Sequence, residues 1–321
     1  MPFRPEEVLF SPTTECNLTC SHCSVPRSKT RLPEKEARRF LKECATLGIK
    51  RVGFTGGEPF LAIGFLCELA RSAVKEGLLF DRIMTNGVWW PGERILKGFL
   101  SGLRDSGYDG SLCVSVDAFH SQDLKKVVRF IKTAVAMWRR PDVVSLACVS
   151  GARDRETAAI LKALSRLLKA KIMKSPAGRL YLKSSSMFIK VYGIDLAPTG
   201  KASILRKPWD GRWFKEDYCK GPGNVFLVMP DGDVKPCCGY ASDDKALTVG
   251  NIRRDSARDI LKSFRRNRFA STVFDSGLRK IRKRLEGSGV RFPGKTSSHC
   301  FFCEYVLTNV PKGALDRCLD R

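Results

Sequence analysis

The sequence predicts an α/β protein whose parallel strands are joined by crossover helices. Short apolar runs rich in β-branched residues alternate with amphipathic stretches through the first two thirds of the chain. One such unit takes about 30 to 40 residues, which suits a strand, a helix and the return to the next strand. A barrel and an open sheet both fit this pattern, and in both folds functional residues gather at the carboxyl ends of the strands.

The expected strands are short, and the expected helices are amphipathic. The first helix, 33–47, begins with proline and acidic residues and ends before Gly48, as helix termini prefer. The residue types and their spacing predict strands over 8–11, 52–55, 82–85, 112–117, 143–149 and 188–192. Further helices are expected over 96–103, 124–137 and 155–169.

The alternation of strands and helices ends after residue 192. Loop-forming residues then gather at 197–200 and 207–211. We therefore place a domain boundary near residue 205, between a first domain over 1–205 and a second over 206–321.

The second domain begins with a predicted β-hairpin. Residues 225–229 and 233–235 flank the turn Pro230-Asp231-Gly232, which is typical of a hairpin connection. A helical stretch over 257–269 follows. A small α+β domain is therefore expected after the first domain.

Composition limits the class of protein. With 321 residues, 43% of them hydrophobic and 28% charged, the chain can build a core, so we expect a soluble globular protein. No run approaches the roughly 18 apolar residues of a spanning helix, and the first residues lack an apolar signal-peptide core. We expect no membrane association and a cytoplasmic location. Thirteen cysteines are too few for a disulfide scaffold, so reduced thiols or metal ligands are favoured.

The net charge of +24 indicates an anionic partner or a solvated basic surface. Arginine and lysine concentrate in 253–284, where Phe264, Phe269 and Phe274 are interleaved with them. We favour a solvated basic face for this segment. If the face binds a partner, an acidic peptide and RNA are the two candidates.

The strongest motif is a cysteine triplet after the first expected strand. Cys16, Cys20 and Cys23 lie close together in a loop, where three thiolates can bind three irons of a cubane cluster. The fourth iron is then left open for another ligand. A zinc site is the alternative, but His22 adjoins Cys23 and is badly placed to complete a tetrahedron.

This CxxxCxxC spacing resembles the signature of the radical SAM enzymes, and Gly56-Gly57-Glu58-Pro59 resembles the motif that binds the amino group of S-adenosylmethionine in that family. Glycines there allow backbone carbonyls to approach a ligand closely. The resemblance implies cofactor contacts from small or polar residues at strand ends: Gly56, Gly57, Glu58, Asn86, Ser115 and Asp117. Capping of the strand ends is the simpler alternative for the last three.

The fold that the resemblance implies is a partial (β/α)6 barrel over about residues 6 to 195. The implied cofactors are S-adenosylmethionine and a [4Fe-4S] cluster. An external electron donor such as flavodoxin or ferredoxin reduces this cluster in the family. The implied chemistry is formation of a 5′-deoxyadenosyl radical, which abstracts hydrogen from an unactivated carbon.

A second cysteine set lies in the C-terminal third. Cys219, Cys237 and the pair Cys300 and Cys303 can together hold one metal centre, and zinc suits a CxxC pair as readily as iron and sulfide. The arrangement resembles the twitch or SPASM extensions of radical SAM enzymes, which implies an auxiliary [4Fe-4S] cluster. Cys318 can replace one of the four ligands, although a buried thiol is the simpler assignment.

Cys238 lies beside an expected ligand, where it either packs or reacts. The Cys237-Cys238 pair and the segment 116–120 resemble peptide epimerases of the epipeptide type. In that family a radical removes an α-hydrogen from an L-residue and a thiol returns hydrogen from the opposite face, so the resemblance makes Cys238 the donor and a precursor peptide, acidic to suit the basic chain, the substrate. For His120 we favour an ordinary loop residue over a substrate contact.

Three alternatives to epimerisation stay open. Crosslinking or dehydrogenation of a peptide uses the same radical, and so does modification of RNA or of a small molecule. A zinc-stabilised, non-catalytic nucleic-acid-binding protein is the remote alternative, because zinc would suit both cysteine sets.

Overall fold

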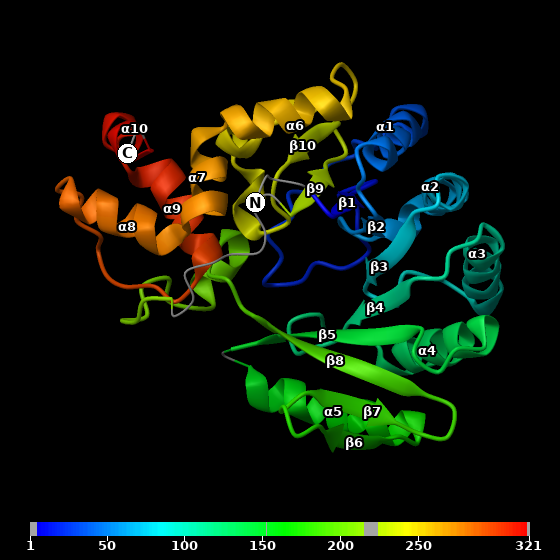
Figure 1. Ribbon diagram of the computed structural model, residues 1–321. Coiled ribbons are helices and arrows are strands. Elements are labelled where there is room, and N and C mark those ends of the chain that lie inside the picture. Colours follow the sequence, from blue (N-terminus) through cyan, green and yellow to red (C-terminus); the bar gives the residue numbers. More distant parts are fainter. Residues whose placement is uncertain (1–4, 152, 215–223, 320–321) are drawn as a thin grey trace.

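The computed structural model describes residues 5–151, 153–214 and 224–319, and among them it contains one mixed sheet of eleven strands. Figure 1 shows this sheet curving through the molecule, with α1 to α4 along its outer side. The strand order is β11-β10-β9-β1-β2-β3-β4-β5-β8-β7-β6. The α/β class is therefore confirmed.

The first half of the sheet is a run of parallel strands with crossover helices. These strands are β1 (Glu7–Phe10), β2 (Arg51–Phe54), β3 (Leu79–Thr85), β4 (Ser111–Ser115), β5 (Val144–Ser150) and β8 (Phe188–Asp195). The helices between them are α1 (Glu34–Thr46), α2 (Ile63–Lys75), α3 (Glu93–Asp105), α4 (Leu124–Trp138) and α5 (Asp154–Leu168). Six parallel strands in consecutive order form the predicted partial barrel, and all six predicted strands overlap observed ones.

Two elements of this half were not predicted. One is α2, which follows a short 3-10 turn at Pro59–Ala62. The other is an antiparallel hairpin of β6 (Lys171–Lys174) and β7 (Leu180–Lys183), inserted before β8. Because β7 pairs with β8, the hairpin extends the sheet and leaves β6 as its last strand.

The C-terminal strands continue the same sheet from its other side. Strand β9 (Val225–Val228) pairs in parallel with β1, and β10 (Asp233–Lys235) pairs with β9 in the predicted hairpin. Strand β11 (Gly250–Asn251) pairs with β10. The sheet is therefore continuous across the predicted boundary near residue 205, which stays a prediction.

Helices complete the C-terminal third: α6 (Ala257–Arg266), α7 (Arg268–Ser276), α8 (Leu278–Gly287), α9 (His299–Asn309) and α10 (Lys312–Leu319). The sequence predicted one helix over 257–269, whereas the chain turns at Asn267. The Asn267 side chain accepts a hydrogen bond from the N–H of Ala270, so this residue ends α6 and caps α7. No helix among the described residues is long and apolar enough to cross a bilayer.

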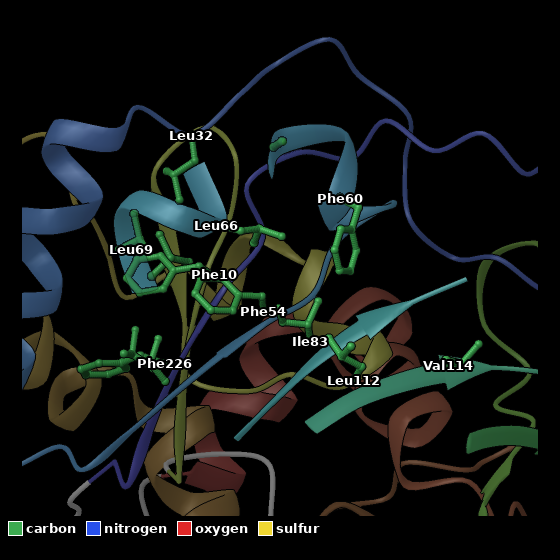
Figure 2. Packing of buried hydrophobic residues seen from close by; sticks show 14 of the residues in the cluster. Phe10, Leu32, Phe54, Phe60, Leu66, Leu69, Ile83, Leu112, Val114 and Phe226 are labelled. Carbon is green, nitrogen blue, oxygen red and sulfur yellow. The ribbon is translucent and has the colours of Figure 1, made fainter. Parts of the chain in front are cut away.

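The main core lies between the sheet and its outer helices (Figure 2). Phe10 on β1 lies 6.5 Å from Phe54 on β2 and 6.2 Å from Phe65 on α2, measured between ring centroids. Phe226 on β9 lies 6.2 Å from Phe40 on α1. The C-terminal hairpin therefore shares its core with the N-terminal half.

This shared core makes Phe226 a test of the continuous sheet. Replacing the fully buried Phe226 by alanine leaves a cavity and should lower the free energy of unfolding by about 3 to 5 kcal/mol. Leu79→Ala, at a side chain 65% exposed, should cost less than about 0.5 kcal/mol. Urea denaturation of both variants measures the difference, and equal losses would contradict the packing described.

Candidate active site

A cavity of about 180 Å³ lies at the carboxyl ends of the first parallel strands. All three cysteines of the triplet line it, and so do the loop after β2, the end of β3 and the end of β4. The sequence-predicted residues that line this cavity are Cys16, Cys20, Cys23, Gly56, Gly57, Asn86 and Ser115. The structure therefore gathers most of the predicted cofactor site around one space.

The cysteine loop is held against the end of β2 by backbone contacts that leave no room for a side chain. The N–H of Gly57 donates to the carbonyl of Thr13 at 2.9 Å, and the N–H of Glu58 donates to the carbonyl of Glu15 at 2.7 Å. A Cβ on Gly57 would lie 2.1 Å from the Glu15 carbonyl oxygen. Gly56 has a φ of +129°, which side chains disfavour. Both glycines are thus required by the loop itself.

Glu58 is buried and faces the end of β3. Its carboxylate accepts hydrogen bonds from the Thr85 hydroxyl at 2.9 Å, the Asn86 N–H at 2.7 Å and the Phe60 N–H at 3.1 Å. Burial raises the pKa of Glu58 to about 7, although these three donors favour the charged form. Glu58 does not line the cavity, so its predicted contact with a ligand amino group stays a prediction.

Asn86 joins the end of β3 to the cysteine loop. Its amide nitrogen lies 3.6 Å from the sulfur of Cys16 and donates to the side-chain oxygen of Asn17 at 2.8 Å. Gln122 in turn donates to the backbone carbonyls of Asn86 and Ser115. Gln122, which no sequence motif marks, thus ties the ends of two neighbouring strands together.

Asp117 holds a histidine in place at the cavity wall. Its carboxylate lies 2.8 Å from His120 Nδ1 and accepts the N–H of Val149 at 2.9 Å. Burial alone would raise the pKa of Asp117, but the His120 contact and backbone donors lower it. Asp117 itself does not line the cavity, whereas His120 does. The structure therefore places His120 at the cavity wall, and the view of it as an ordinary loop residue stays a prediction.

His22 also lines the cavity, although it was considered only as a badly placed zinc ligand. Its ring lies 4.8 Å from that of His120, and its buried Nδ1 has no hydrogen-bond partner among the described residues. Burial, and then the neighbouring His120 ring, lower the pKa of His22 to about 4. A neutral imidazole with a buried unpaired nitrogen is suited to a polar ligand in this cavity.

The thiol set is suited to cations. Burial, and then the neighbouring Cys23 and Cys16, raise the pKa of Cys20 to about 12. A thiolate at Cys20 therefore needs compensating positive charge, which iron would provide. The N–H of Leu18 lies 3.4 Å from the Cys16 sulfur and can support a ligating thiolate.

The second cysteine set surrounds a small apolar cavity beside α9. Cys237, Cys300 and Cys303 line it, and the backbone of Gly239 lies close to two of their sulfurs. A Cβ on Gly239 would lie 3.0 Å from the sulfur of Cys300 and 3.2 Å from that of Cys237. Cys219 lies outside the described residues. Three of the four predicted auxiliary ligands are therefore together.

Cys318 is not part of this cavity. It is buried, and its sulfur lies 3.6 Å from the carbonyl of Ile281 on α8. Packing between α8 and α10 accounts for this thiol.

Tyr240 connects the two cysteine sets and was missed by the sequence analysis, because no motif marks it. It lines the cavity of the triplet, and burial and the thiols of Cys300 and Cys23 raise its pKa to about 12. The exposed Cys238 also raises the pKa of this phenol. The segment 238–240 therefore lies between the two candidate metal sites.

Comparison with known proteins agrees with this geometry. The Radical SAM superfamily matches residues 10–140, and an iron-sulfur cluster-binding domain, SPASM, matches residues 219–285. The chain therefore contains a radical SAM domain followed by a SPASM domain. These domains imply S-adenosylmethionine with a [4Fe-4S] cluster and auxiliary clusters.

Three individual proteins are similar to this chain. The peptide biosynthesis protein YydG of Bacillus subtilis is 23% identical over 316 residues, covering 93% of this chain and 91% of YydG. A GTP 3′,8-cyclase of Geobacter sulfurreducens is 28% identical over 236 residues, covering 68% of each chain. The solved structure of native anSMEcpe with bound AdoMet and the Cp18Cys peptide shares the fold, with a TM-score of 0.57, 15% identity and coverage of 98% of this chain and 99% of that one.

The close contact at Gly57 predicts the effect of adding one methyl group. Gly57→Ala should displace the cysteine loop and lower both the iron content and the SAM-dependent release of 5′-deoxyadenosine. Gly92→Ala is the matched control, because a Cβ there meets nothing within 4 Å. Iron and sulfide analysis after anaerobic reconstitution measures the first effect. Equal iron in both variants would refute the steric argument.

Glu58 predicts a pH dependence of stability. Between its ordinary pKa of 4.5 and its folded pKa of about 7, the unfolded chain releases a proton that the folded chain keeps. The free energy of unfolding should therefore fall as pH rises through this window, by about 3 kcal/mol. Glu58→Gln should lack this slope. Urea unfolding at about pH 5 and about pH 8 compares the two chains, and parallel curves would contradict the assignment.

Proposed function

We propose that this chain is a radical SAM enzyme that modifies a peptide, and that the modification is L-to-D epimerisation at an α-carbon. Similarity to YydG, a peptide biosynthesis protein, over 93% of this chain supports the peptide class. A cytoplasmic location is part of the proposal, because the cysteines must stay reduced to bind iron.

The cofactor ligands follow from the cavity. Cys16, Cys20 and Cys23 would hold the [4Fe-4S] cluster, and the walls formed by Gly56, Gly57, Asn86 and Ser115 would bind S-adenosylmethionine. When bound there, the cluster and S-adenosylmethionine would supply the radical chemistry that abstracts a hydrogen atom from the substrate. Asp117 would position His120 against the cofactor through its hydrogen bond.

Auxiliary-cluster ligation is assigned to Cys219, Cys237, Cys300 and Cys303. Pro236, Leu247 and other apolar residues line the cavity beside the last three. An apolar surrounding limits solvent access to a cluster, which tunes its potential.

Cys238 is the proposed hydrogen donor, and its position is the observation that carries the epimerase assignment. It is exposed, whereas its neighbour Cys237 is buried, and it lies two residues before Tyr240, which lines the cofactor cavity. Loss of an α-hydrogen leaves a carbon radical, to which the Cys238 S–H would deliver a hydrogen atom from the opposite face. The resulting thiyl needs one electron and one proton, and a donor of the flavodoxin or ferredoxin class would supply the electron.

A small molecule and RNA are the two alternative substrate classes. A small molecule is the second candidate, because a GTP 3′,8-cyclase is similar to 68% of this chain. RNA has weaker support, since Phe264 and Phe269 of the basic helices are buried in the core and present no face for base stacking.

Deuterated water distinguishes these reactions. The anaerobically reconstituted enzyme, S-adenosylmethionine and a reductant are incubated with short peptides encoded beside its gene. Epimerisation should place one deuterium at a D-configured α-carbon, because the exchangeable Cys238 thiol supplies that atom. Mass spectrometry and chiral amino-acid analysis measure the product, and a loss of two hydrogens would instead indicate crosslinking or dehydrogenation.

The donor role is tested by one pair of variants. Cys238→Ala should still release 5′-deoxyadenosine and should reduce deuterium incorporation to background. Cys67→Ala, a change on α2 outside both cysteine sets, should leave both readouts as in the wild type. Normal deuterium incorporation by Cys238→Ala would exclude this cysteine as the donor.

A further inference from the structure

We infer that the flank of the barrel built from α5 and the β6–β8 strands is the docking surface for an acidic, extended segment of the peptide substrate. This inference rests on the proposed function, and it locates the surface that holds the substrate. We call residues 157–194 the basic flank. It lies at the β6 end of the sheet, whereas the basic helices α6 to α8 lie beside the opposite end (Figure 1).

The basic flank has a single sign of charge, and carboxylates lie only at its borders: Asp154 and Glu156 in the first turn of α5 and Asp195 at the end of β8. Between residues 157 and 194 the chain has no aspartate or glutamate. All of its basic side chains are exposed, and none forms an ion pair within the part of the chain that the structure describes. They are Lys162, Arg166, Lys169, Lys171, Lys174, Arg179, Lys183 and Lys190.

The basic helices differ from this flank, because part of their charge is neutralised within the helices. Lys262 pairs with Asp259 on α6, and Arg282 pairs with Glu286 on α8. An acidic partner therefore meets less competition from protein carboxylates at the basic flank.

Strand β6 offers hydrogen-bonding groups as well as charge. It is the last strand of the sheet, and all four of its residues are exposed. Ile172 and Met173 between its two lysines are 45% and 47% exposed. Lysines on an edge strand repel a second basic edge, so this edge disfavours self-association and favours addition of an acidic strand.

A groove of about 740 Å³ runs beside this hairpin, between α5 and the strands β7 and β8. Thr157 and Leu161 of α5 form one side, and Arg179 and Lys190 lie on the other. Asp154 is the one carboxylate on its lining, and it accepts the N–H of Gly151. The groove can therefore hold an extended chain under a positive rim.

A chain of contacts through Val149 and Asp117 links the groove to the candidate active site. Val149 at the end of β5 lines the groove, and its N–H donates to Asp117. Asp117 holds His120, which lines the cofactor cavity. A peptide lying in the groove is thus led toward the strand ends where the chemistry is proposed.

The aromatic side chains of the flank favour a peptide over RNA. Tyr181 stacks on Phe188 at 5.0 Å between ring centroids, and Tyr192 contacts the Arg82 guanidinium at 5.4 Å. These rings are already paired, whereas single-stranded RNA binding uses aromatic faces that are open to bases.

Peptide binding by the full-length enzyme tests this inference directly. The probe is a fluorescein-labelled peptide of alternating glutamate and valine, about twelve residues long, measured by anisotropy at about 50 and about 200 mM salt. The triple variant K171E, K174E and R179E should raise its Kd about tenfold. The charge-matched control R279E, K280E and K283E on α8 should change the Kd less than about twofold.

The outcomes separate the docking surface from the proposed function. Conservative exchanges K171R and K174R should retain binding, and a lysine-for-glutamate peptide should not bind. Equal weakening by both triple variants, or none by the first, would overturn the inference, as would tight binding of tRNA at the hairpin in place of the acidic peptide. Release of 5′-deoxyadenosine is measured in each variant, so loss of docking is distinguishable from loss of the radical chemistry.

Discussion

The rest of the site depends on the absence of side chains at Gly56 and Gly57. The cysteine loop approaches the end of β2 so closely that a Cβ on Gly57 would overlap the carbonyl oxygen of Glu15. Two backbone hydrogen bonds hold the contact. Because these contacts fix the backbone of the loop, the thiols of its three cysteines reach the same cavity without a helix or strand between them.

Glu58 extends this constraint to the neighbouring strand. Its buried carboxylate joins Thr85 and Asn86 at the end of β3, and Asn86 returns to the loop at Cys16. Burial makes the charged form of Glu58 costly, as its raised pKa indicates. In return the carboxylate fixes the position of the strand end. Both of its oxygens accept hydrogen bonds, so the end of β3 cannot slide past the loop.

The continuous sheet brings the two halves of the chain to one site. Pairing of β9 with β1 places the β9–β10 hairpin, which Cys237 and Cys238 closely follow, beside the strand that leads into the cysteine loop. Tyr240, two residues after Cys238, can then line the cavity of the first cysteine set. Cys300 of the second set contributes to its raised pKa. A SPASM domain that had its own separate sheet would need other contacts to hold the same position.

The amino-acid sequence by itself determined the six parallel strands, the C-terminal hairpin and the residues able to bind iron, because strand periodicity and cysteine spacing are local properties. It also indicated Gly56 and Gly57, whose conformational freedom is a property of the residue type. The end of α6 at Asn267 was not predicted. The same residue ends one helix and caps the next, so the helical pattern continues through it.

Only the tertiary structure decided which side chains share a space. His22, His120 and Tyr240 come from distant segments and meet at the cavity, whereas Glu58 and Asp117 turn toward backbone donors beside it. The basic charge was visible in the sequence, but its placement was not. The α6 and α8 helices pair part of their charge with carboxylates one turn away, whereas the pairing of β6 with β7 and of β7 with β8 brings the uncompensated charge onto neighbouring strands at the end of the sheet.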